Sequence, residues 1–351
     1  MAEVLLRDHT TLRLGGPASR FVEVSSERDL VGAVQRADEA GEALLILGGG
    51  SNLVISDAGF AGLVVHVATG GMVSDIDDED TLASCSGVSV TVAAGEIWDD
   101  FVTHAVAHRW VGVEALAGIP GSIGATPIQN VGAYGQAVAD TIASVRTWDR
   151  VDRCQRTFAM ADCGFGYRTS RFKAEPGRYV ILDVTFQLNL GTWGAPVEYA
   201  ELARHLGVEL GARAPIDEVR EAVLALRRSK GMVLDPHDHD TWSAGSFFTN
   251  PVLAAKRAAL LPEDLPRWPT AEGEIKTSAA WLIEHSGFAK GYGNARVGVS
   301  GKHSLALTNR GGARTQDLLA LATEVRDGVA QRFGIWLVPE PTLVGCELGS
   351  V

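Results

Sequence analysis

Residues 118–135 read GIPGSIGATPIQNVGAYG, with five glycines and two prolines in eighteen residues. This composition suits neither a helix nor a simple strand. Glycine allows positive φ and removes the Cβ that keeps ligands away, and successive N–H groups in such turns form concave donor sites. The stretch therefore predicts a loop that brings main chain close to an anionic or carbonyl oxygen. The plainer alternative is a series of tight turns without a ligand.

A second glycine run, Gly48-Gly49-Gly50-Ser51-Asn52, follows the apolar segment 43–47. No Gly-Lys-Ser/Thr sequence closes this run, and it fits the GxGxxG pattern only because a glycine triplet satisfies many patterns. These features disfavour a nucleoside triphosphatase and a standard Rossmann dehydrogenase. Two separate glycine loops suit one large cofactor, a dinucleotide whose pyrophosphate and ring system are both held by main chain.

The length of 351 residues is enough for two or three domains with buried cores. No stretch approaches the roughly 18 apolar residues of a membrane span, and the N-terminus lacks the pattern of a signal peptide. We therefore expect a soluble, cytoplasmic protein without a membrane partner. The net charge of −12 argues against a general nucleic-acid surface.

Nothing in the sequence indicates a metal site. The four cysteines have no CxxC spacing and no histidines at metal-ligand intervals, so we interpret them as reduced structural thiols. The acidic run at 75–80 is typical of a solvated turn. The four cysteines are Cys85, Cys154, Cys163 and Cys346.

The first 70 residues read as an α/β unit. Short β-prone runs are expected at 21–24, 43–47 and 63–67, and Ser26 begins a helix that reaches about Ala40. The glycine run at 48–52 then falls at the end of a strand, which is where α/β folds place ligands. A strand at 88–93 and a helix at 98–108 follow, and a second domain is expected to start near residue 70.

The second half contains a predicted linker and three helices. TWGAP at 192–196 reads as the linker, and Ile216, Val219, Val223 and Leu226 share one helical face after it. Helices are also predicted at 279–285 and 318–333, followed by a strand at 335–338.

Three polar residues lie in contexts that suit chemistry. Arg168 follows two flexible glycines, which suits a guanidinium that must reach a carboxylate, although pairing with a surface acid would explain it equally well. Ser246 lies between a glycine and two aromatics, and taken alone it reads as a turn or capping serine. Glu340 is held between two prolines, which constrain the direction of its carboxylate.

Six segments together resemble the UDP-N-acetylenolpyruvoylglucosamine reductase family, the FAD enzymes of peptidoglycan precursor synthesis. They occur in order at compatible separations over nearly the whole chain. The segments are LGGPASRF (14–21), LILGGGSNLVISDAGFAG (45–62), ALAGIPGSIGATPIQNVGAYG (115–135), CGFGYRTSRFK (163–173), SAGSFFTNP (243–251) and WLVPEPTLVG (336–345).

The resemblance implies an α+β fold with a flavin-binding part of the vanillyl-alcohol-oxidase (PCMH) type and a separate α+β substrate-binding domain. Residues 1–69 with 335–351 would form the first FAD-binding subdomain, 70–196 the second, and 197–334 the substrate-binding domain. The C-terminal strand is expected to return to the first subdomain. A monomer is expected.

The implied reaction reduces the enolpyruvyl group of UDP-N-acetylglucosamine enolpyruvate to give UDP-N-acetylmuramate. NADPH supplies the hydride through non-covalently bound FAD. By motif position, Arg168 would polarise the substrate carboxylate, Ser246 would protonate the α-carbon, and Glu340, carrying or sharing a proton, would work with Arg168.

The resemblance also implies a set of binding residues. Contacts to FAD are expected from Gly48, Gly49, Gly50, Ser51, Asn52, Gly118, Pro120, Gly121, Ser122, Gly124, Ala125, Gln129, Asn130, Gly132, Ala133 and Tyr134. Substrate contacts are expected from Tyr167, Arg168, Tyr199, Arg227, Lys230, Asn250, Lys276, His285 and Glu340.

Some of these substrate assignments have particular features. Tyr199 corresponds to the tyrosine that closes over the uridine diphosphate in the longer-loop type of the family. Arg227 and Lys230 suit a diphosphate, although cations at a helix C-terminus are also favoured by the helix dipole. His285 replaces an amide common in this helix, and Pro341-Thr342 stands where some relatives carry an arginine.

Two other functions remain open from the sequence. A flavin oxidase of the same fold would need an oxygen-accessible flavin and often a covalent histidine or cysteine link, and no histidine lies in either glycine run. A non-catalytic UDP-sugar or flavin-binding protein would keep the glycine runs and lose the reactive residues. The joint presence of Arg168, Ser246 and Glu340 argues against the second.

Overall fold

The computed structural model describes residues 3–76 and 87–349, which form two compact units. Unit 1 consists of residues 1–18, 50–60 and 230–351, and unit 2 of residues 19–49 and 61–229. The chain thus leaves unit 1 and returns to it twice. The predicted three-part division cuts the chain elsewhere and stays a prediction.

Unit 2 begins with the predicted α/β unit. A three-stranded sheet has the order β1 (Ala18–Val24), β4 (Phe60–Val67), β2 (Leu44–Leu47), and β2 pairs in parallel with β4. Helix α1 (Glu27–Glu39) connects β1 to β2, and the Ser26 side chain caps it by accepting from the Asp29 N–H. The predicted strands, the helix and its start are confirmed.

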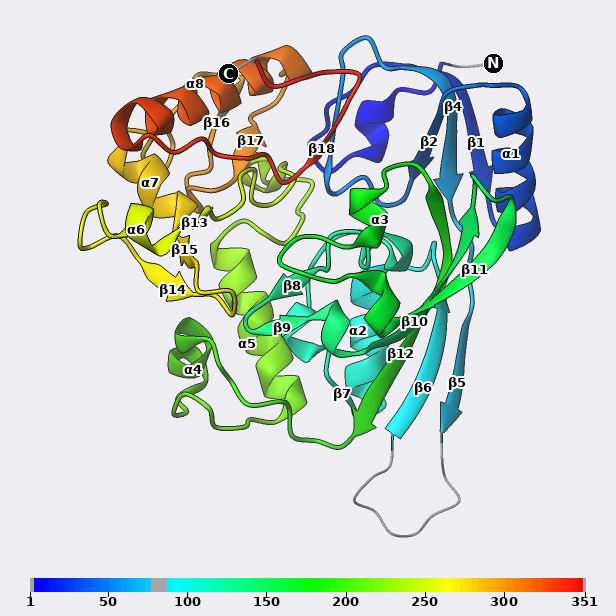
Figure 1. The fold of residues 1–351 in the computed structure, drawn as a ribbon, viewed down its shortest axis with the longest axis horizontal. Coiled ribbons are helices and arrows are strands. Elements are labelled where there is room, and N and C mark those ends of the chain that lie inside the picture. Colours follow the sequence, from blue (N-terminus) through cyan, green and yellow to red (C-terminus); the bar gives the residue numbers. More distant parts are fainter. Residues whose placement is uncertain (1–2, 77–86, 350–351) are drawn as a thin grey trace. The chain divides into compact units, whose positions relative to one another are not determined.

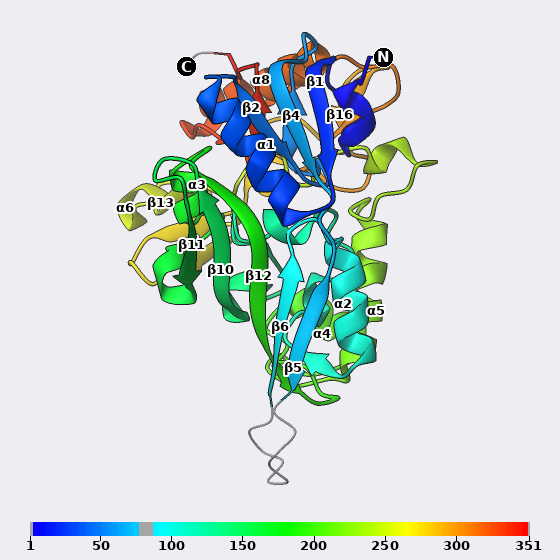
Figure 2. The same ribbon diagram turned by 90° about the vertical axis from the view of Figure 1, so that its right-hand side faces the viewer.

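The second sheet of unit 2 is antiparallel (Figure 2). Its strand order is β11 (Cys154–Ala159), β10 (Ile142–Asp149), β12 (Tyr179–Leu190), β6 (Gly87–Ala93) and β5 (Met72–Ile76), and β7 (Trp110–Val111) pairs with β12. Helix α2 (Trp98–Ala107) packs on this sheet through Trp98 and Phe101, whose rings contact Phe186 of β12.

Charged side chains tie α1 to the second sheet. Arg146 on β10 pairs with Glu27 of α1 and with Asp183 of β12. Arg150 pairs with Asp38 at the other end of α1. These bonds explain why residues 19–49 belong with the antiparallel sheet rather than forming a separate N-terminal domain.

The rest of unit 2 is built from short elements and the predicted helix after residue 215. Helix α5 (Ile216–Ser229) buries Ile216, Val219, Val223 and Leu226 as expected. The predicted linker at 192–196 lies within unit 2, where the Gly194 N–H donates to the Ala214 carbonyl. The short elements are η2 (Glu114–Leu116), η3 (Ile123–Ala125), β8 (Gly132–Ala133), β9 (Gln136–Ala137), η4 (Val138–Asp140), η5 (Met160–Cys163), α3 (Arg171–Ala174) and α4 (Ala200–Leu206).

Unit 1 joins segments from both ends of the chain (Figure 1). Strand β18 (Thr342–Val344) pairs in parallel with β3 (Leu53–Ile55), which confirms that the C-terminal strand returns to the N-terminal region. The predicted helices are observed as α7 (Ala279–His285) and α8 (Thr315–Phe333). The other elements are η1 (Leu6–His9), η6 (His239–Thr241), α6 (Ala255–Ala258), the sheet β13 (Val252–Leu253), β15 (Ile275–Thr277), β14 (Arg267–Pro269), and the pair β16 (Val297–Val299), β17 (Leu307–Asn309).

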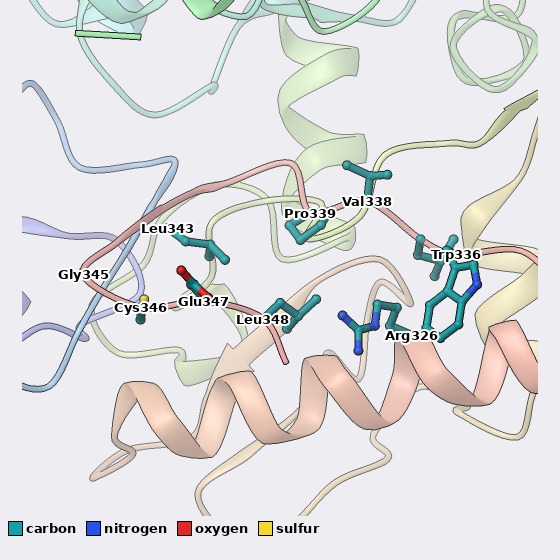
Figure 3. A pocket seen from close by; sticks show the side chains of 10 residues that line it. Arg326, Trp336, Val338, Pro339, Leu343, Gly345, Cys346, Glu347 and Leu348 are labelled. Atoms are coloured by element: carbon teal, nitrogen blue, oxygen red, sulfur yellow. The ribbon is translucent and has the colours of Figure 1, made fainter. Parts of the chain in front are cut away.

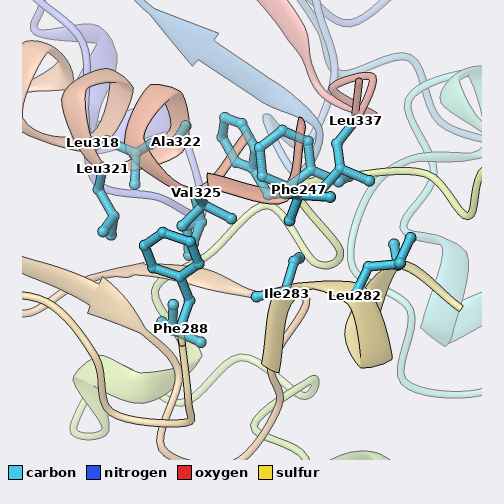
Figure 4. Packing of buried hydrophobic residues seen from close by; sticks show 14 of the residues in the cluster. Phe247, Leu282, Ile283, Phe288, Leu318, Leu321, Ala322, Val325 and Leu337 are labelled. Atoms are coloured by element: carbon cyan, nitrogen blue, oxygen red, sulfur yellow. The ribbon is translucent and has the colours of Figure 1, made fainter. Parts of the chain in front are cut away.

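The core of unit 1 lies between α7, α8 and the segment 244–248 (Figure 4). Phe247 and Phe248 are almost fully buried there and contact each other edge to face, with ring centroids 5.1 Å apart. The side chains of α8 that face this core include Leu318, Leu321 and Val325. The two aromatics therefore anchor the residue before them, Ser246, to a rigid core.

The predicted strand at 335–338 is wrong. Ile335 and Leu337 are buried while Trp336 and Val338 are exposed, so the alternation that suggested a strand is real, but the segment forms no ladder. The segment pairs with residues 248–249 through an isolated bridge at Pro339 and a backbone hydrogen bond to the Val338 carbonyl, and this pairing cannot extend through Pro339 and Pro341 because proline has no N–H. The strand therefore begins only after them, at Thr342.

The remaining predictions concern thiols, the acidic run and membranes. Among the described residues, Cys154, Cys163 and Cys346 are free, and burial raises the pKa of the Cys163 thiol to about 11. Cys85 and residues 77–80 of the acidic run lie outside the described residues, while Asp75 lies in β5. Across the described helices, none combines the length and apolar character needed to span a bilayer.

Candidate functional site

The two glycine runs meet in unit 2. A Cβ placed on Gly49 would lie 2.9 Å from the Gly121 Cα, and one on Gly48 would lie 2.4 Å from the Ser122 Oγ. A side chain at Gly49 would meet backbone and force the two loops apart, whereas the Ser122 hydroxyl can turn away from a side chain at Gly48. Glycine is therefore required at position 49 for the contact, and the expectation that both runs serve one site has structural support within this unit.

Where the two glycine runs meet, four backbone N–H groups have no acceptor within the described residues. Within residues 3–76 and 87–349, no protein acceptor takes the N–H of Gly48, Gly49, Gly121 or Ser122. Adjacent N–H groups on a turn that donate to no protein acceptor can bind anionic oxygens, because each carries a partial positive charge. These residues fit a cofactor with a pyrophosphate group, as FAD has.

The rest of the 118–135 run is fixed by its own hydrogen bonds. The Gly118 N–H donates to Asp99 at 2.5 Å, and the Gly124 N–H donates to the Ala94 carbonyl at 2.8 Å. Gly132 and Ala133 form β8, and Asn130 and Tyr134 both take positive φ. Pro120, Ala125 and Gln129 are partly buried beside them. The loop is thus preformed rather than slack.

The last three residues of the first run lie in unit 1. Gly50 takes φ of +59°, and a Cβ on it would lie 1.9 Å from the His9 carbonyl oxygen. Ser51 is partly buried. The Asn52 carbonyl accepts from the Thr342 N–H, and its Nδ2 donates to the Glu340 carbonyl at 3.5 Å. Asn52 therefore contacts the backbone of a predicted catalytic residue.

Arg168 lies on a tight turn of unit 2, at φ of +53°. The turn is closed by hydrogen bonds between Gly166 and Thr169. The Arg168 carbonyl accepts from Lys173, and its guanidinium lies 5.9 Å from the ring of Tyr167, which is exposed. A non-glycine residue at positive φ is strained, and such strain is found where a side chain must be aimed.

Arg227 on α5 lies near Arg168. Burial lowers the pKa of the Arg227 guanidinium, Tyr134 and Asp99 raise it, and Arg168 lowers it. Two neighbouring guanidiniums repel, so the pair favours an anion between or beside them. Lys230, the first residue after α5, belongs to unit 1.

Tyr199 precedes α4 in unit 2, and its exposed ring contacts Tyr134 edge to face, with centroids 5.2 Å apart. The buried carboxylate of Glu114 accepts from Gln136 at 2.9 Å and from the Ala195 N–H at 3.3 Å. It thus links the β8–β9 hairpin, whose turn contains Tyr134, to the segment before Tyr199. No motif marks Glu114 in the sequence, so its place beside these residues was not predicted.

Ser246 and Glu340 come together in unit 1. The Glu340 N–H donates to the Phe247 carbonyl at 2.9 Å, and Phe248 forms a bridge with Pro339. The Phe247 N–H donates to the Leu305 carbonyl at 2.7 Å. Glu340 is buried, with 9% of its surface exposed, and Ser246 is half-buried. The backbone therefore places these two side chains on neighbouring segments.

The other predicted substrate residues of unit 1 surround α7. The Asn250 Oδ1 accepts from the Ala279 N–H at 2.9 Å, which caps the start of the helix. Lys276 lies on β15 and its Nζ is 5.9 Å from the Trp268 ring. His285 ends the helix, stacks on Trp281 at 3.6 Å, and bonds through Nδ1 to the Trp281 carbonyl. The Asn250 Oδ1 and the His285 Nδ1 therefore already have hydrogen-bond partners at α7.

A pocket of unit 1 lies between α8 and the C-terminal segment (Figure 3). Its volume is about 920 Å³, and it is lined by Arg326 and residues on both sides of Glu340. Arg326 pairs with Asp327, donates to the Gly349 carbonyl, and lies 5.3 Å from the Trp336 ring. None of the predicted site residues lines this pocket.

Two protein-family models match this sequence, one in its N-terminal half and one in its C-terminal half. Residues 18–157 match the FAD binding domain, and residues 235–344 match the C-terminal domain of UDP-N-acetylenolpyruvoylglucosamine reductase. The paired glycine runs, the antiparallel sheet and the first match define an FAD-binding part of the PCMH type, and the second match adds a domain of a reductase, so the protein is an FAD-dependent reductase.

Full-length relatives give the family. The chain is 55% identical over 349 residues to the UDP-N-acetylenolpyruvoylglucosamine reductase of Cutibacterium acnes, covering 99% of this chain and 90% of that protein. It is 54% identical to that of Thermobifida fusca, covering 98% of each. The crystal structure of the reductase from Thermus caldophilus shares the fold, with a TM-score of 0.65 at 23% identity over 98% of each chain. The chain belongs to the UDP-N-acetylenolpyruvoylglucosamine reductase family, and the predicted family, fold class and FAD cofactor are confirmed.

Proposed function

We propose that this protein reduces the enolpyruvyl double bond of UDP-N-acetylglucosamine enolpyruvate with NADPH. The β-carbon gains a hydride and the α-carbon gains a proton, so that UDP-N-acetylmuramate and NADP⁺ are formed. Identity above 50% to reductases of this name over nearly the whole chain supports the assignment. The reaction belongs to peptidoglycan precursor synthesis.

FAD, when bound, accepts the hydride from NADPH and delivers it to the substrate. The FAD pyrophosphate would be held by backbone N–H groups that have no acceptor within the described protein, those of Gly48, Gly49, Gly121 and Ser122. The other predicted contacts in the 118–135 run, apart from the Asn130 side chain, would hold the remaining cofactor groups, since that run is preformed by its own hydrogen bonds.

We assign Arg168 to the substrate carboxylate. When the β-carbon receives a hydride, negative charge develops at the α-carbon and spreads into the carboxylate. A guanidinium binds a carboxylate with two parallel hydrogen bonds and stabilises this charge. One well-placed donor of this kind contributes about 3–4 kcal/mol to catalysis. The turn that carries Arg168 is closed by hydrogen bonds between Gly166 and Thr169, which fixes the backbone from which the guanidinium extends and supports this role.

Ser246 is assigned to donate the proton to the α-carbon. The buried aromatics that follow it fix its backbone, which limits its hydroxyl to the few positions that rotation about χ1 allows. Glu340 is assigned to stabilise the same developing charge. For this its carboxyl must carry or share a proton, because an ionised carboxylate would oppose negative charge on the substrate.

Other residues are assigned to the nucleotide part of the substrate. Arg227 and Lys230 would bind the diphosphate, and Tyr199 would close over it. Asn250, through its Nδ2 group, and Lys276 would contact phosphate or uridine, together with Tyr167 and His285. Because NADPH and UDP-linked precursors are cytoplasmic metabolites, we also propose that the enzyme is cytoplasmic. We further propose that it acts as a monomer.

One observation carries the catalytic assignment: the hydrogen bond from the Glu340 N–H to the Phe247 carbonyl. It joins the two segments that hold Ser246 and Glu340, which are far apart in the sequence. Two residues chosen from separate motifs thus lie on paired segments of one unit.

The test is anaerobic stopped-flow absorbance near 450 nm. NADPH should bleach the yellow protein, and UDP-N-acetylglucosamine enolpyruvate should then restore the colour rapidly. The variants R168K, S246A and E340Q should keep the first step and slow the second. Colour that returns only with oxygen would instead indicate a flavin oxidase, and a protein that binds no FAD would contradict the assignment.

A further inference from the structure

We propose that Asn130 is a positioning residue for Arg168. This inference rests on the proposed role of Arg168 at the substrate carboxylate. Both residues lie in unit 2, and Asn130 belongs to the glycine-rich run at 118–135. The family resemblance predicts a contact with FAD, and the structure adds two hydrogen bonds that its side chain makes within the protein.

The first bond reaches the turn that carries Arg168. The Asn130 Nδ2 donates to the Gly166 carbonyl at 3.1 Å, and Gly166 closes that turn through its hydrogen bonds with Thr169. The second bond anchors Asn130 itself, because its Oδ1 accepts from the Ala139 N–H at 3.1 Å. Asn130 therefore links a fixed loop to the base of the turn.

The residue type fits this task. Asn130 takes φ of +49°, a conformation that asparagine adopts more readily than most residues. Its amide carries a donor and an acceptor on two separate atoms, so it can bond to the Gly166 carbonyl and the Ala139 N–H at the same time. An aspartate would keep the acceptor for Ala139 but would turn a second oxygen toward the Gly166 carbonyl.

A second side chain, that of Ser170, also attaches this turn to the glycine-rich run. The Ser170 hydroxyl donates to the Ile128 carbonyl, and Ser170 is 2% exposed. The turn is thus attached to the glycine-rich run at both of its ends, through Asn130 and through Ser170. Arg168 lies between these two attachments, so its direction depends on both.

The experiment measures single-turnover rates in the complete holoenzyme with Asn130→Asp, Arg168→Ala and the double variant. Small displacements of a catalytic group reduce rates by about 10- to 100-fold, and we expect N130D to slow flavin reoxidation by the substrate by that factor. In the R168A background the same change should slow it less than about twofold, because the residue acts through Arg168.

Two further variants separate positioning from folding and flavin binding. Asn130→Gly removes both side-chain bonds and tolerates the positive φ, so it should reproduce the loss if N130D is poorly folded. Asp140→Ala breaks a hydrogen bond in the same region, to the Ala137 N–H, without touching the turn, and should leave both half-reactions unchanged. The affinity for FAD should be unchanged in N130D.

Several results would overturn the proposal. Equal losses in both backgrounds would show that Asn130 acts independently of Arg168. A parallel loss of FAD affinity or of reduction by NADPH would show that it serves the cofactor instead. If R168A itself reoxidises at the normal rate, the role of Arg168 fails and this inference fails with it, whereas the flavin and NADPH assignments stand.

Discussion

The two regions that carry the proposed catalytic residues are built differently. In unit 2, the turn of Arg168 is attached by side chains, through the amide of Asn130 and the hydroxyl of Ser170. In unit 1, Ser246 and Glu340 are placed by backbone hydrogen bonds on a core of buried aromatics. The first region therefore depends on the identity of a few polar residues, and the second depends on packing.

The largest expected effect comes from Ser246→Ala. Loss of a general acid slows proton transfer by about 10²- to 10⁴-fold, so flavin reoxidation by the substrate should slow by that factor in stopped-flow measurements. Since the segment is held by backbone and packing, the free energy of unfolding should stay within about 0.5 kcal/mol of the wild type. A rate within threefold of the wild type would exclude Ser246 as the proton donor.

Phe247→Ala should act on stability. Truncating a buried phenylalanine costs about 3–5 kcal/mol, and urea unfolding followed by tryptophan fluorescence would measure it. The matched change F247L keeps most of the volume and should cost less than about 1.5 kcal/mol. Equal effects of the two changes would show that packing does not hold this segment.

Gly49→Ala tests the contact between the glycine runs. The added Cβ would lie 2.9 Å from the Gly121 Cα, and overpacking of this kind costs about 1–3 kcal/mol. We expect FAD affinity to fall about 10- to 100-fold, measured by flavin fluorescence on titration into apoprotein. A control at Gly41, where a Cβ would meet no atom within 4 Å, should leave affinity unchanged in G41N. Unchanged affinity in G49A would refute the shared cradle.

A smaller effect is expected for Ser170→Ala. One hydrogen bond contributes about 1 kcal/mol, so flavin reoxidation should slow about 5-fold while reduction by NADPH is kept. The Ser170 side chain also caps α3, so S170A should lower the stability of this region slightly as well. Restoration by S170T, which keeps the hydroxyl, would separate the hydrogen bond from volume. No slowing would leave Asn130 as the side chain that holds the turn.

The smallest effect concerns pH. A hydrogen bond from Arg146 lowers the pKa of Glu27 below its ordinary value of 4.5. The stabilisation is therefore complete above pH 4.5 and is lost as the pH falls through the lower folded value. The variant E27Q should be less stable than the wild type at pH 7, and the gap in urea unfolding should close at lower pH. A gap independent of pH would contradict this.

Much of the fold could be predicted because local patterns marked it. Ser26 identified the start of α1, the spacing from Ile216 to Leu226 identified α5, and the glycine run identified the loop before Asn130. The strand at 335–338 failed because alternation reports burial, whereas a ladder also needs donors that Pro339 and Pro341 lack. The units could not be predicted because Arg146 and Arg150 tie α1 to a distant sheet.

The site was predicted only where a motif marked it. Ser246, Glu340 and Arg168 were chosen from their local contexts and the family resemblance, and the structure places the first two on paired segments. The resemblance predicted Asn130 as an FAD contact, and its bonds to Gly166 and Ala139 could not be predicted because a sequence does not show which side-chain groups bond to distant backbone. Glu114 gave no signal at all, since a buried carboxylate has the same sequence signature as an exposed one.

The pairing of β18 with β3 has a consequence for how the chain folds during its synthesis. Unit 2 is complete once residue 229 has been made, so it can fold while the ribosome is still adding residues. The segment 50–60 is made before most of unit 2, yet Leu53–Ile55 gains its strand partner only when residues 342–344 emerge. An early part of the polypeptide is therefore among the last to reach its final contacts, and the slowest loop closure belongs to unit 1.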